Sequence, residues 1–219
     1  MSYSFTQLEN YYGMHNTSYN IILAPLHRGG GFGPRLTNKD ESHVYSILGP
    51  IGVVDQLPVF GDKRNFEYLV WHEFSHSFIN PLTTHYQKEV LQSQELFAPI
   101  AKQMEILAYS NWETSLNEHL IRTITARRNL SEDTMPFYEE TLKAEKRQGF
   151  FYIDMLSDKI ASYEANREKY QVQLPFTVAT NKIVSDHVYE GTHLRLITAL
   201  PHPSNTTQRP SYLYRSTIR

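Results

Sequence analysis

The sequence predicts an α+β fold in which a small N-terminal β-sheet packs on one central helix and a mostly α-helical lobe follows. Residues 19–26 and 43–48 are rich in β-branched and aromatic residues and are bounded by Gly, Pro and Asn, as strands often are. From residue 64 onward, apolar residues recur mainly at helical spacing. A His-Glu-x-x-His pattern at residues 72–76 lies where the strand-like region gives way to the helical one.

A chain of 219 residues, 40% of them hydrophobic, is long enough to bury one sizeable core. We therefore expect a single domain over residues 1–200, with the sheet and central helix in residues 1–82 and the helical lobe in residues 83–200. Residues 201–219 contain three prolines separated by Ser, Thr and Asn, which predicts an extended or disordered tail.

Local signals predict the individual elements. The glycine-rich residues 29–34 indicate a flexible hairpin connection between the two strands or, alternatively, a mobile flap whose neighbouring edge strand aligns an extended peptide above the central helix. The central helix should begin at Asp62 or Asn65 and end at Asn80-Pro81, because the residue before proline avoids the helical conformation. The other expected helices cover residues 3–12, 84–108 with a break or kink at Pro99, 111–128, 136–170 with a solvated face at 139–147, and a short segment ending near 188.

The His-Glu-x-x-His pattern predicts half of a catalytic zinc site. In a helix, residues four apart lie one above the other, so the imidazoles of His72 and His76 can converge on one metal ion. Glu73 lies about 100° further round the helix, beside the position that a catalytic metal leaves open. Its carboxylate can there accept a proton from water and pass it to a leaving amine. We expect one Zn²⁺ per chain.

A catalytic zinc usually has three protein ligands, so one more residue is needed. The metzincin form of the motif would require Gly at position 79 and His at position 82, where this chain has Ile79 and Leu82. That solution is excluded, and a carboxylate from a later helix is the alternative.

The segment 111–128 is the best source of that carboxylate. Ser-Asn-Trp-Glu at residues 110–113 is a capping-box pattern, with Ser110 as the predicted cap, and an apolar stripe at intervals of four follows. Glu118 in this segment is our candidate for the third ligand, and His85 and His119 are the competing candidates.

The pattern His-Glu-Phe-Ser-His, followed by Asn-Glu-His-Leu-Ile-Arg at residues 117–122, resembles the gluzincin, or thermolysin-like, branch of zinc metallopeptidases. The third ligand of that branch is the Glu of an Asn-Glu-x-x-x-Asp helix, which corresponds to Glu118. The longer run from His72 to Pro81, with the early Tyr-Tyr-Gly, also resembles an uncharacterised bacterial domain-of-unknown-function family presumed to be peptidases. The resemblance covers residues 8 to about 188 and implies a zincin-like fold and a zinc-dependent peptidase.

The chain departs from the gluzincin pattern at Arg122, where the family has the Asp that orients a zinc-bound His. A cation cannot accept an imidazole N–H, so another acceptor is required, for which Asp55, Asn80 or a backbone carbonyl are candidates. We expect Arg122 either to pair with Glu118, four residues earlier, or to contact a substrate carboxylate.

The resemblance also implies a side chain that donates a hydrogen bond to the oxyanion of the reaction, normally a Tyr or His from the second half of the domain. No motif surrounds any such residue in this chain. The candidates are Tyr152, His187, Tyr189 and His193.

Composition indicates which classes of partner the protein can bind. The net charge is −2 with dispersed Lys and Arg, which argues against nucleic-acid binding, and no apolar run reaches the roughly 18 residues of a membrane span. The chain has no cysteine, which excludes disulfides and thiolate ligands. We expect a peptide or protein substrate. The N-terminus lacks a secretory signal and on its literal reading predicts a cytoplasmic protein, although an exported protein whose leader has been removed would look the same.

Two other functions fit the same residues. One is a metal-dependent hydrolase of a non-peptide amide, and the other is a zincin-shaped binding module that has lost activity or uses its metal for structure. The change Glu73→Gln separates them, because a hydrolase should keep its metal and lose turnover whereas a binding module should be unaffected.

Overall fold

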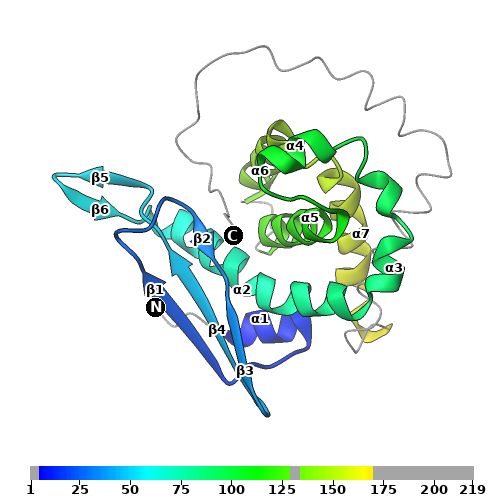
Figure 1. Cartoon of the computed structure of the whole chain (residues 1–219), viewed down its shortest axis with the longest axis horizontal. Coiled ribbons are helices and arrows are strands. Elements are labelled where there is room, and N and C mark those ends of the chain that lie inside the picture. Colours follow the sequence, from blue (N-terminus) through cyan, green and yellow to red (C-terminus); the bar gives the residue numbers. More distant parts are fainter. Residues whose placement is uncertain (1–4, 129–133, 170–219) are drawn as a thin grey trace.

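Strand β4 (Glu41–Leu48) forms the centre of the sheet in the computed structural model, which describes residues 5–128 and 134–169 (Figure 1). Every second residue of β4 is buried and those between are partly exposed, so one face of the strand lies on the core. Strand β1 (Ser18–Leu23) pairs with β4 in parallel. The predicted α+β class, with a small sheet before a mostly helical region, is confirmed.

The opposite edge of β4 pairs with two short antiparallel strands, β2 (Gly31–Phe32) and β3 (Arg35–Asn38). The expectation that the glycine-rich segment merely connects two strands is therefore wrong. Because β1 and β4 run parallel, no tight hairpin can join them, and part of the segment between them becomes strand β2.

A separate two-stranded sheet follows, made of β5 (Gly52–Val54) and β6 (Leu57–Val59). Its turn residues Asp55 and Gln56 have φ values of 49° and 63°, which is the left-handed backbone of the tight turns that hairpins favour. The hairpin projects from the body of the molecule at the left of Figure 1.

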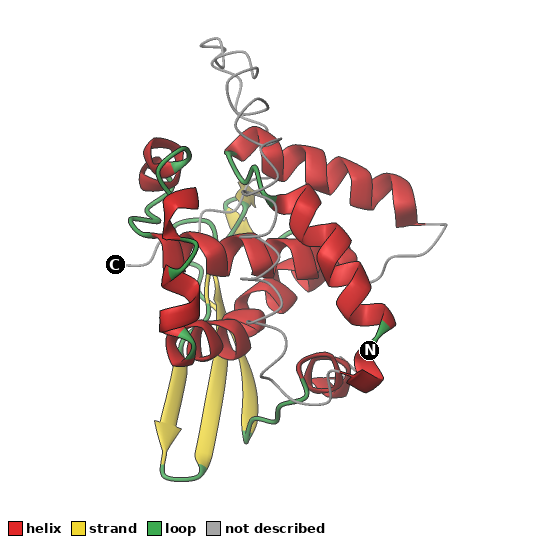
Figure 2. Cartoon of the chain, turned by 90° about the vertical axis from the view of Figure 1, so that its right-hand side faces the viewer, coloured by secondary structure: helices red, strands yellow, loops and turns green. Residues whose placement is uncertain are grey.

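Helix α2 (Lys63–His85) lies between the sheet and the helical region and contacts both β4 and α5. Its predicted cap is confirmed, since the Asp62 carboxylate accepts the backbone N–H of Asn65 at 2.8 Å. Every residue from Leu69 to Ile79 is buried. The motif residues therefore lie on a helix that protein surrounds on all sides, with strands on one side of the molecule and most helices on the other (Figure 2).

The prediction that α2 ends before Pro81 is wrong, because the helix continues to His85 with Pro81 inside it. A proline within a helix removes the N–H that would bond to the carbonyl four residues earlier, here that of Ser77. The Arg35 guanidinium, from β3, donates to this carbonyl at 3.0 Å. A side chain from the sheet thus replaces the missing backbone donor, which explains how the helix tolerates the proline.

Helix α5 (Trp112–Arg127) is the second helix that is buried on all sides, from Ser115 to Ala126. Its cap is Asn111, whose side chain accepts the N–H of Thr114 at 2.9 Å, and not Ser110 as predicted. The remaining helices are shorter or more peripheral. They are α1 (Phe5–Tyr12), α3 (Gln87–Leu91), α4 (Ala101–Ile106), α6 (Met135–Gln148), α7 (Ile153–Ala165) and the 3₁₀ turns Gln94–Leu96 and Arg167–Lys169.

Two predicted helices are divided. Residues 84–108 form the last two residues of α2, then α3, a 3₁₀ turn and α4, with the break before α4 at the predicted Pro99. The single helix expected over residues 136–170 is instead α6 and α7, because Gly149 ends α6 with a left-handed φ of 109°. A Cβ at Gly149 would also lie 2.2 Å from the Gln103 side chain.

The core joins α2, α5 and α7 through apolar residues that the helical spacing largely predicted. The helical spacing of residues 84–108 predicts that Leu91 is buried, but its side chain is exposed. None of the helices in the described ranges combines the length and the hydrophobicity of a membrane span. The predicted short helix near residue 188 and the predicted tail lie outside the described residues.

Candidate metal centre

His72 and His76 meet Glu118 where helices α2 and α5 cross. The two imidazole rings have centroids 5.1 Å apart, as expected of residues one turn apart on the same helix face. Nε2 of His76 lies 3.2 Å from Oε1 of Glu118, and Nε2 of His72 lies 3.7 Å from Oε2 of the same carboxylate. One potential ligand atom from each residue falls within 4.8 Å of the other two, so the three residues could hold a metal ion.

The three side chains are almost completely removed from solvent, with 4%, 6% and 1% of His72, His76 and Glu118 exposed. Nε2 of His76 and Oε1 of Glu118 have no hydrogen-bond partner in the described structure. A buried polar atom that lacks a partner costs about 1–3 kcal/mol. These two atoms lie 3.2 Å apart, and a cation bound to both would satisfy them.

Asn80 lies behind His76, one turn further along α2. Its side-chain oxygen is 3.3 Å from Nδ1 of His76. An amide oxygen only accepts, so Nδ1 carries a hydrogen, and in the neutral imidazole Nε2 then has its lone pair toward Glu118. Of the acceptors that the sequence suggested, Asn80 is therefore within hydrogen-bond distance of His76, whereas Asp55 lies in the β5–β6 turn.

Burial and charge together set the protonation of the three residues. Burial lowers the pKa of His72 to about 3, so its imidazole is neutral and has a lone pair to offer. Burial acts in the same direction on His76, but the Glu118 carboxylate more than offsets it and raises the pKa. Burial would raise the pKa of Glu118, yet His76, His72 and Arg122 lower it well below its ordinary value. The carboxylate therefore stays ionised, as a metal ligand must.

Glu73 lies on the side of α2 that faces the sheet. A Cβ placed on Gly31 would be 2.2 Å from Oε1 of Glu73, and one on Gly33 would be 2.2 Å from the Glu73 carbonyl oxygen. Strand β2 and the residue after it thus approach α2 as closely as only glycine allows. Neither carboxylate oxygen of Glu73 has a hydrogen-bond partner in the described structure. Burial raises the pKa of this group to about 7.

Arg122 continues the site on the far side of Glu118. Its Nε donates to Oε2 of Glu118 at 3.0 Å, as the four-residue spacing suggested, and its Nη1 donates to Oε2 of Glu145 at 2.8 Å. The expectation that residues 139–147 form a solvated face is therefore wrong at Glu145, which is 5% exposed. Tyr68 on α2 donates from its hydroxyl to Oε1 of Glu145 at 3.1 Å.

The competing third ligands lie elsewhere. His85 is exposed at the end of α2. His119 is buried, but its Nδ1 lies 2.7 Å from the Ser115 carbonyl and its ring packs against Phe150. Adjacent residues on a helix point about 100° apart, so the orientation of Glu118 toward α2 directs His119 away from it.

The candidate oxyanion donors fall into two groups. The Tyr152 hydroxyl donates to the Leu96 carbonyl at 2.8 Å, and its ring packs against Trp112 and His119. In this arrangement it is not available to a substrate. His187, Tyr189 and His193 lie outside the described residues.

Sequence reasoning did not find Glu145 or Tyr68, nor the close approach of Gly31 to Glu73. A signal for Glu145 was present, because it follows Leu142 by three residues and so lies on the apolar stripe of α6. A carboxylate on a buried stripe requires a cation, and Arg122 is on the buried helix α5. Nothing local identifies Gly31, since its role depends on the pairing of β2 with β4.

The model of the family described as Domain of unknown function (DUF4932) matches residues 2–176, which is most of the chain. The chain belongs to the DUF4932 family. No curated protein and no solved structure matches it. The family description names no activity, so inferences about function rest on the residues of this DUF4932 chain.

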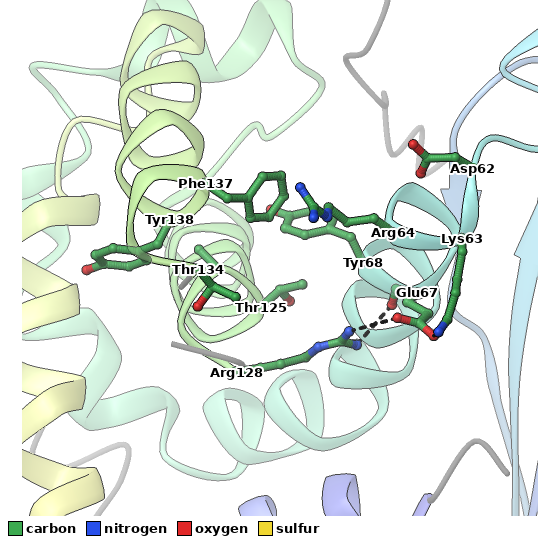
Figure 3. Close-up of a pocket in the computed structure, with 11 residues that line it drawn as sticks. Asp62, Lys63, Arg64, Glu67, Tyr68, Thr125, Arg128, Thr134, Phe137 and Tyr138 are labelled. Carbon is green, nitrogen blue, oxygen red and sulfur yellow. Dashed lines mark hydrogen bonds and ion pairs between the residues drawn. The ribbon is translucent and has the colours of Figure 1, made fainter. Parts of the chain in front are cut away.

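The DUF4932 chain also has a cavity of about 710 Å³ between the start of α2, the end of α5 and the start of α6 (Figure 3). Figure 3 shows the Arg128 side chain reaching across to Glu67 on one side, while Phe137 lies near Arg64 on the other. Among the described residues that line it, none is a candidate metal ligand, but Tyr68 is included. The cavity therefore borders Tyr68, whose hydroxyl donates to Glu145.

Proposed function

We propose that this DUF4932 protein is a zinc-dependent peptidase of the gluzincin type, with His72, His76 and Glu118 as zinc ligands. The observation that supports this best is the meeting of these three side chains from two helices, where Nε2 of His76 and Oε1 of Glu118 face one another without a hydrogen-bond partner among the described residues. Two nitrogens and one carboxylate oxygen form a ligand set of catalytic zinc, which leaves one position for water or substrate. The same set fits carboxylate-preferring ions less well.

A zinc ion held by these ligands would supply part of the chemistry of peptide hydrolysis, and the protein would supply the rest. A zinc ion in such a site lowers the pKa of water toward neutrality and polarises a carbonyl. The protein must then provide a base, and Glu73 follows the first ligand directly in the sequence. A carboxyl group whose pKa is raised to about 7 can both accept and release a proton near neutral pH.

In the proposed reaction, Glu73 takes a proton from the attacking water and later gives it to the departing amine, so each turnover leaves Glu73 ionised again. Asn80 keeps His76 in the tautomer that has a lone pair at Nε2. An oxyanion donor is still required, and His187, Tyr189 and His193 remain the candidates.

The experiment combines metal content with turnover. Purified protein should contain close to one zinc per chain and should digest a peptide library in a reaction that a chelator stops. Glu73→Gln should retain the zinc and lose the digestion. Glu105→Gln, an exposed carboxylate on α4, is the matched control and should change neither. Zinc binding without any peptide hydrolysis would contradict the proposal.

A structural metal site is the second candidate, because the three ligands and Glu73 are all at least 94% buried. Structural sites are closed, whereas catalytic ones keep an open position. In that case Glu73→Gln would leave the function unchanged, and zinc removal would affect stability alone.

A further inference from the structure

We propose that Arg122 is a positioning residue that holds one oxygen of Glu118 and leaves the other for the metal, with Glu145 neutralising the Arg122 charge. This inference rests on the metal binding assumed in the proposed function but not on the peptidase activity. It assigns a role to the position at which the chain departs most clearly from the gluzincin pattern.

The two oxygens of Glu118 differ in their surroundings. Oε2 accepts a hydrogen bond from Nε of Arg122 at 3.0 Å. Among the described residues Oε1 has no hydrogen-bond partner, and it lies 3.2 Å from Nε2 of His76. A carboxylate held at one oxygen cannot rotate freely, so Oε1 stays directed toward the imidazoles of α2.

Arg122 is itself fixed from two further directions. Its Nη1 donates to Glu145 at 2.8 Å, and its Cζ lies 4.2 Å from the centre of the Phe150 ring. Both contacts come from the α6 to α7 region, so Arg122 ties α5 to α6 at the level of the metal ligands. A guanidinium has a planar set of donors that can satisfy two carboxylates at once, which a lysine cannot match.

Glu145 resolves a charge problem that Arg122 would otherwise create. A lone buried cation at 3.0 Å from Glu118 would cancel the negative charge that attracts a metal ion. With Glu145 paired to Arg122, the two charges cancel and Glu118 keeps its own for the metal. The Tyr68 hydroxyl and the Gln148 side-chain amide each donate to Glu145 at 3.1 Å, which holds it in place.

Stability alone does not explain this arrangement. Replacing a buried ion pair by apolar residues is often neutral or stabilising, because the desolvation of both charges outweighs their attraction. Arg122 and Glu145 are 6% and 5% exposed, so their desolvation is nearly complete. A buried pair in contact with a candidate ligand is therefore better explained by what it does for that ligand.

The test measures zinc affinity by competition with a chromophoric chelator, and coordination by the visible spectrum of the Co²⁺-substituted protein. Arg122→Met should weaken zinc binding by about 10–100-fold, the range for residues that support metal ligands, and should change the Co²⁺ spectrum. Arg122→Lys should recover part of the affinity, since it restores the charge and one donor. Arg127→Met is the matched control, because Arg127 lies on the same helix and pairs with Glu164 instead.

A double change separates positioning from stability. Arg122→Met with Glu145→Gln removes both buried charges and should restore thermal stability relative to Arg122→Met alone, while zinc affinity stays low. If the double variant recovered the zinc affinity of the natural protein, or if Arg127→Met weakened binding as much as Arg122→Met, the inference would be wrong.

If Arg122→Met does not fold, the single change Glu145→Gln tests the positioning role of Arg122. It keeps the shape of the side chain and removes its charge, so a several-fold loss of zinc affinity supports the inference and an unchanged affinity overturns it. Failure of the proposed function is distinct, since it would appear as zinc bound normally by the natural protein without peptide hydrolysis. Absence of zinc binding by the natural protein would overturn both.

Discussion

The two sides of helix α2 hold their functional side chains in different ways. On the side toward α5, His72 and His76 face a carboxylate that Arg122 and Glu145 fix through charged hydrogen bonds. On the side toward the sheet, Glu73 has no hydrogen-bond partner in the described structure and is confined by the glycine backbone of β2. One side has the features of a cation site, and the other leaves a carboxyl group able to exchange a proton.

This difference predicts that the two sides can be impaired independently. A change on the α5 side should remove the metal and with it any activity. A change on the sheet side should alter activity and leave metal affinity intact. Changes at Glu73, at the metal and at Gly31 test this separation, and a change at Arg35 tests how α2 accommodates Pro81.

The largest effect is expected for Glu73→Gln. Because a general base contributes about 10²–10⁴-fold to a reaction, peptide turnover should fall by that factor. Zinc content and zinc affinity should equal those of the natural protein, as measured by metal analysis and chelator competition. A parallel loss of zinc would show that the sheet side and the α5 side are not separable.

Metal removal should have the next largest effect, on stability. A ligand present at about 100 times its dissociation constant stabilises the folded state by about 2.7 kcal/mol. For a protein of this size that corresponds to a fall of roughly 5–11 °C in Tm when a chelator removes the metal, measured by calorimetry. Glu73→Gln should show the same fall, and Glu118→Gln should show none.

Gly31→Ala should disturb the sheet side alone. The new methyl group would lie 2.2 Å from Oε1 of Glu73, so the carboxylate or strand β2 must shift. Overpacking of this kind costs about 1–3 kcal/mol, and we expect a clear loss of turnover with zinc affinity unchanged. Gly52→Ala is the control, since its nearest contact is an ordinary 3.7 Å to Val59. Unchanged activity in Gly31→Ala would mean that the close approach of β2 does not position Glu73.

The smallest effect is expected for Arg35→Met. This change removes the donor to the Ser77 carbonyl that Pro81 leaves without its helical partner, and it should cost about 1–2 kcal/mol of stability by denaturant unfolding. The further change Pro81→Ala restores a backbone N–H and should recover most of that loss. If Arg35→Met has no effect unless Pro81 is also changed, the explanation for the uninterrupted helix is incorrect.

Much of the site could be predicted because it depends on local spacing. The four-residue interval between His72 and His76 places both on one helix face whatever the remainder of the fold. Glu118 was found because a capped helix follows at a suitable distance in the sequence, although the cap itself was assigned one residue too early, to Ser110 and not Asn111. The geometry around these residues agrees with the chemistry that suggested them.

The features that escaped prediction depend on contacts between distant segments. By local rules Pro81 predicts the end of a helix. The helix continues because Arg35 on β3 donates to the Ser77 carbonyl, which the proline leaves without a backbone donor. Glu145 belongs to a charged run that predicts a solvent-exposed face, and only the fold shows that Arg122 pairs with it. The closeness of Gly31 to Glu73 depends on how β2 pairs with β4, which strand propensity alone does not determine.

The most direct test of the account is the zinc content and affinity of the natural protein beside His72→Ala and Glu118→Gln. We predict one zinc per chain in the natural protein, and in both variants a loss of affinity greater than the roughly 100-fold upper range for residues that only support a ligand. Full zinc affinity in Glu118→Gln, with a normal far-ultraviolet circular dichroism spectrum, would contradict the central claim that α2 and α5 together form the metal site.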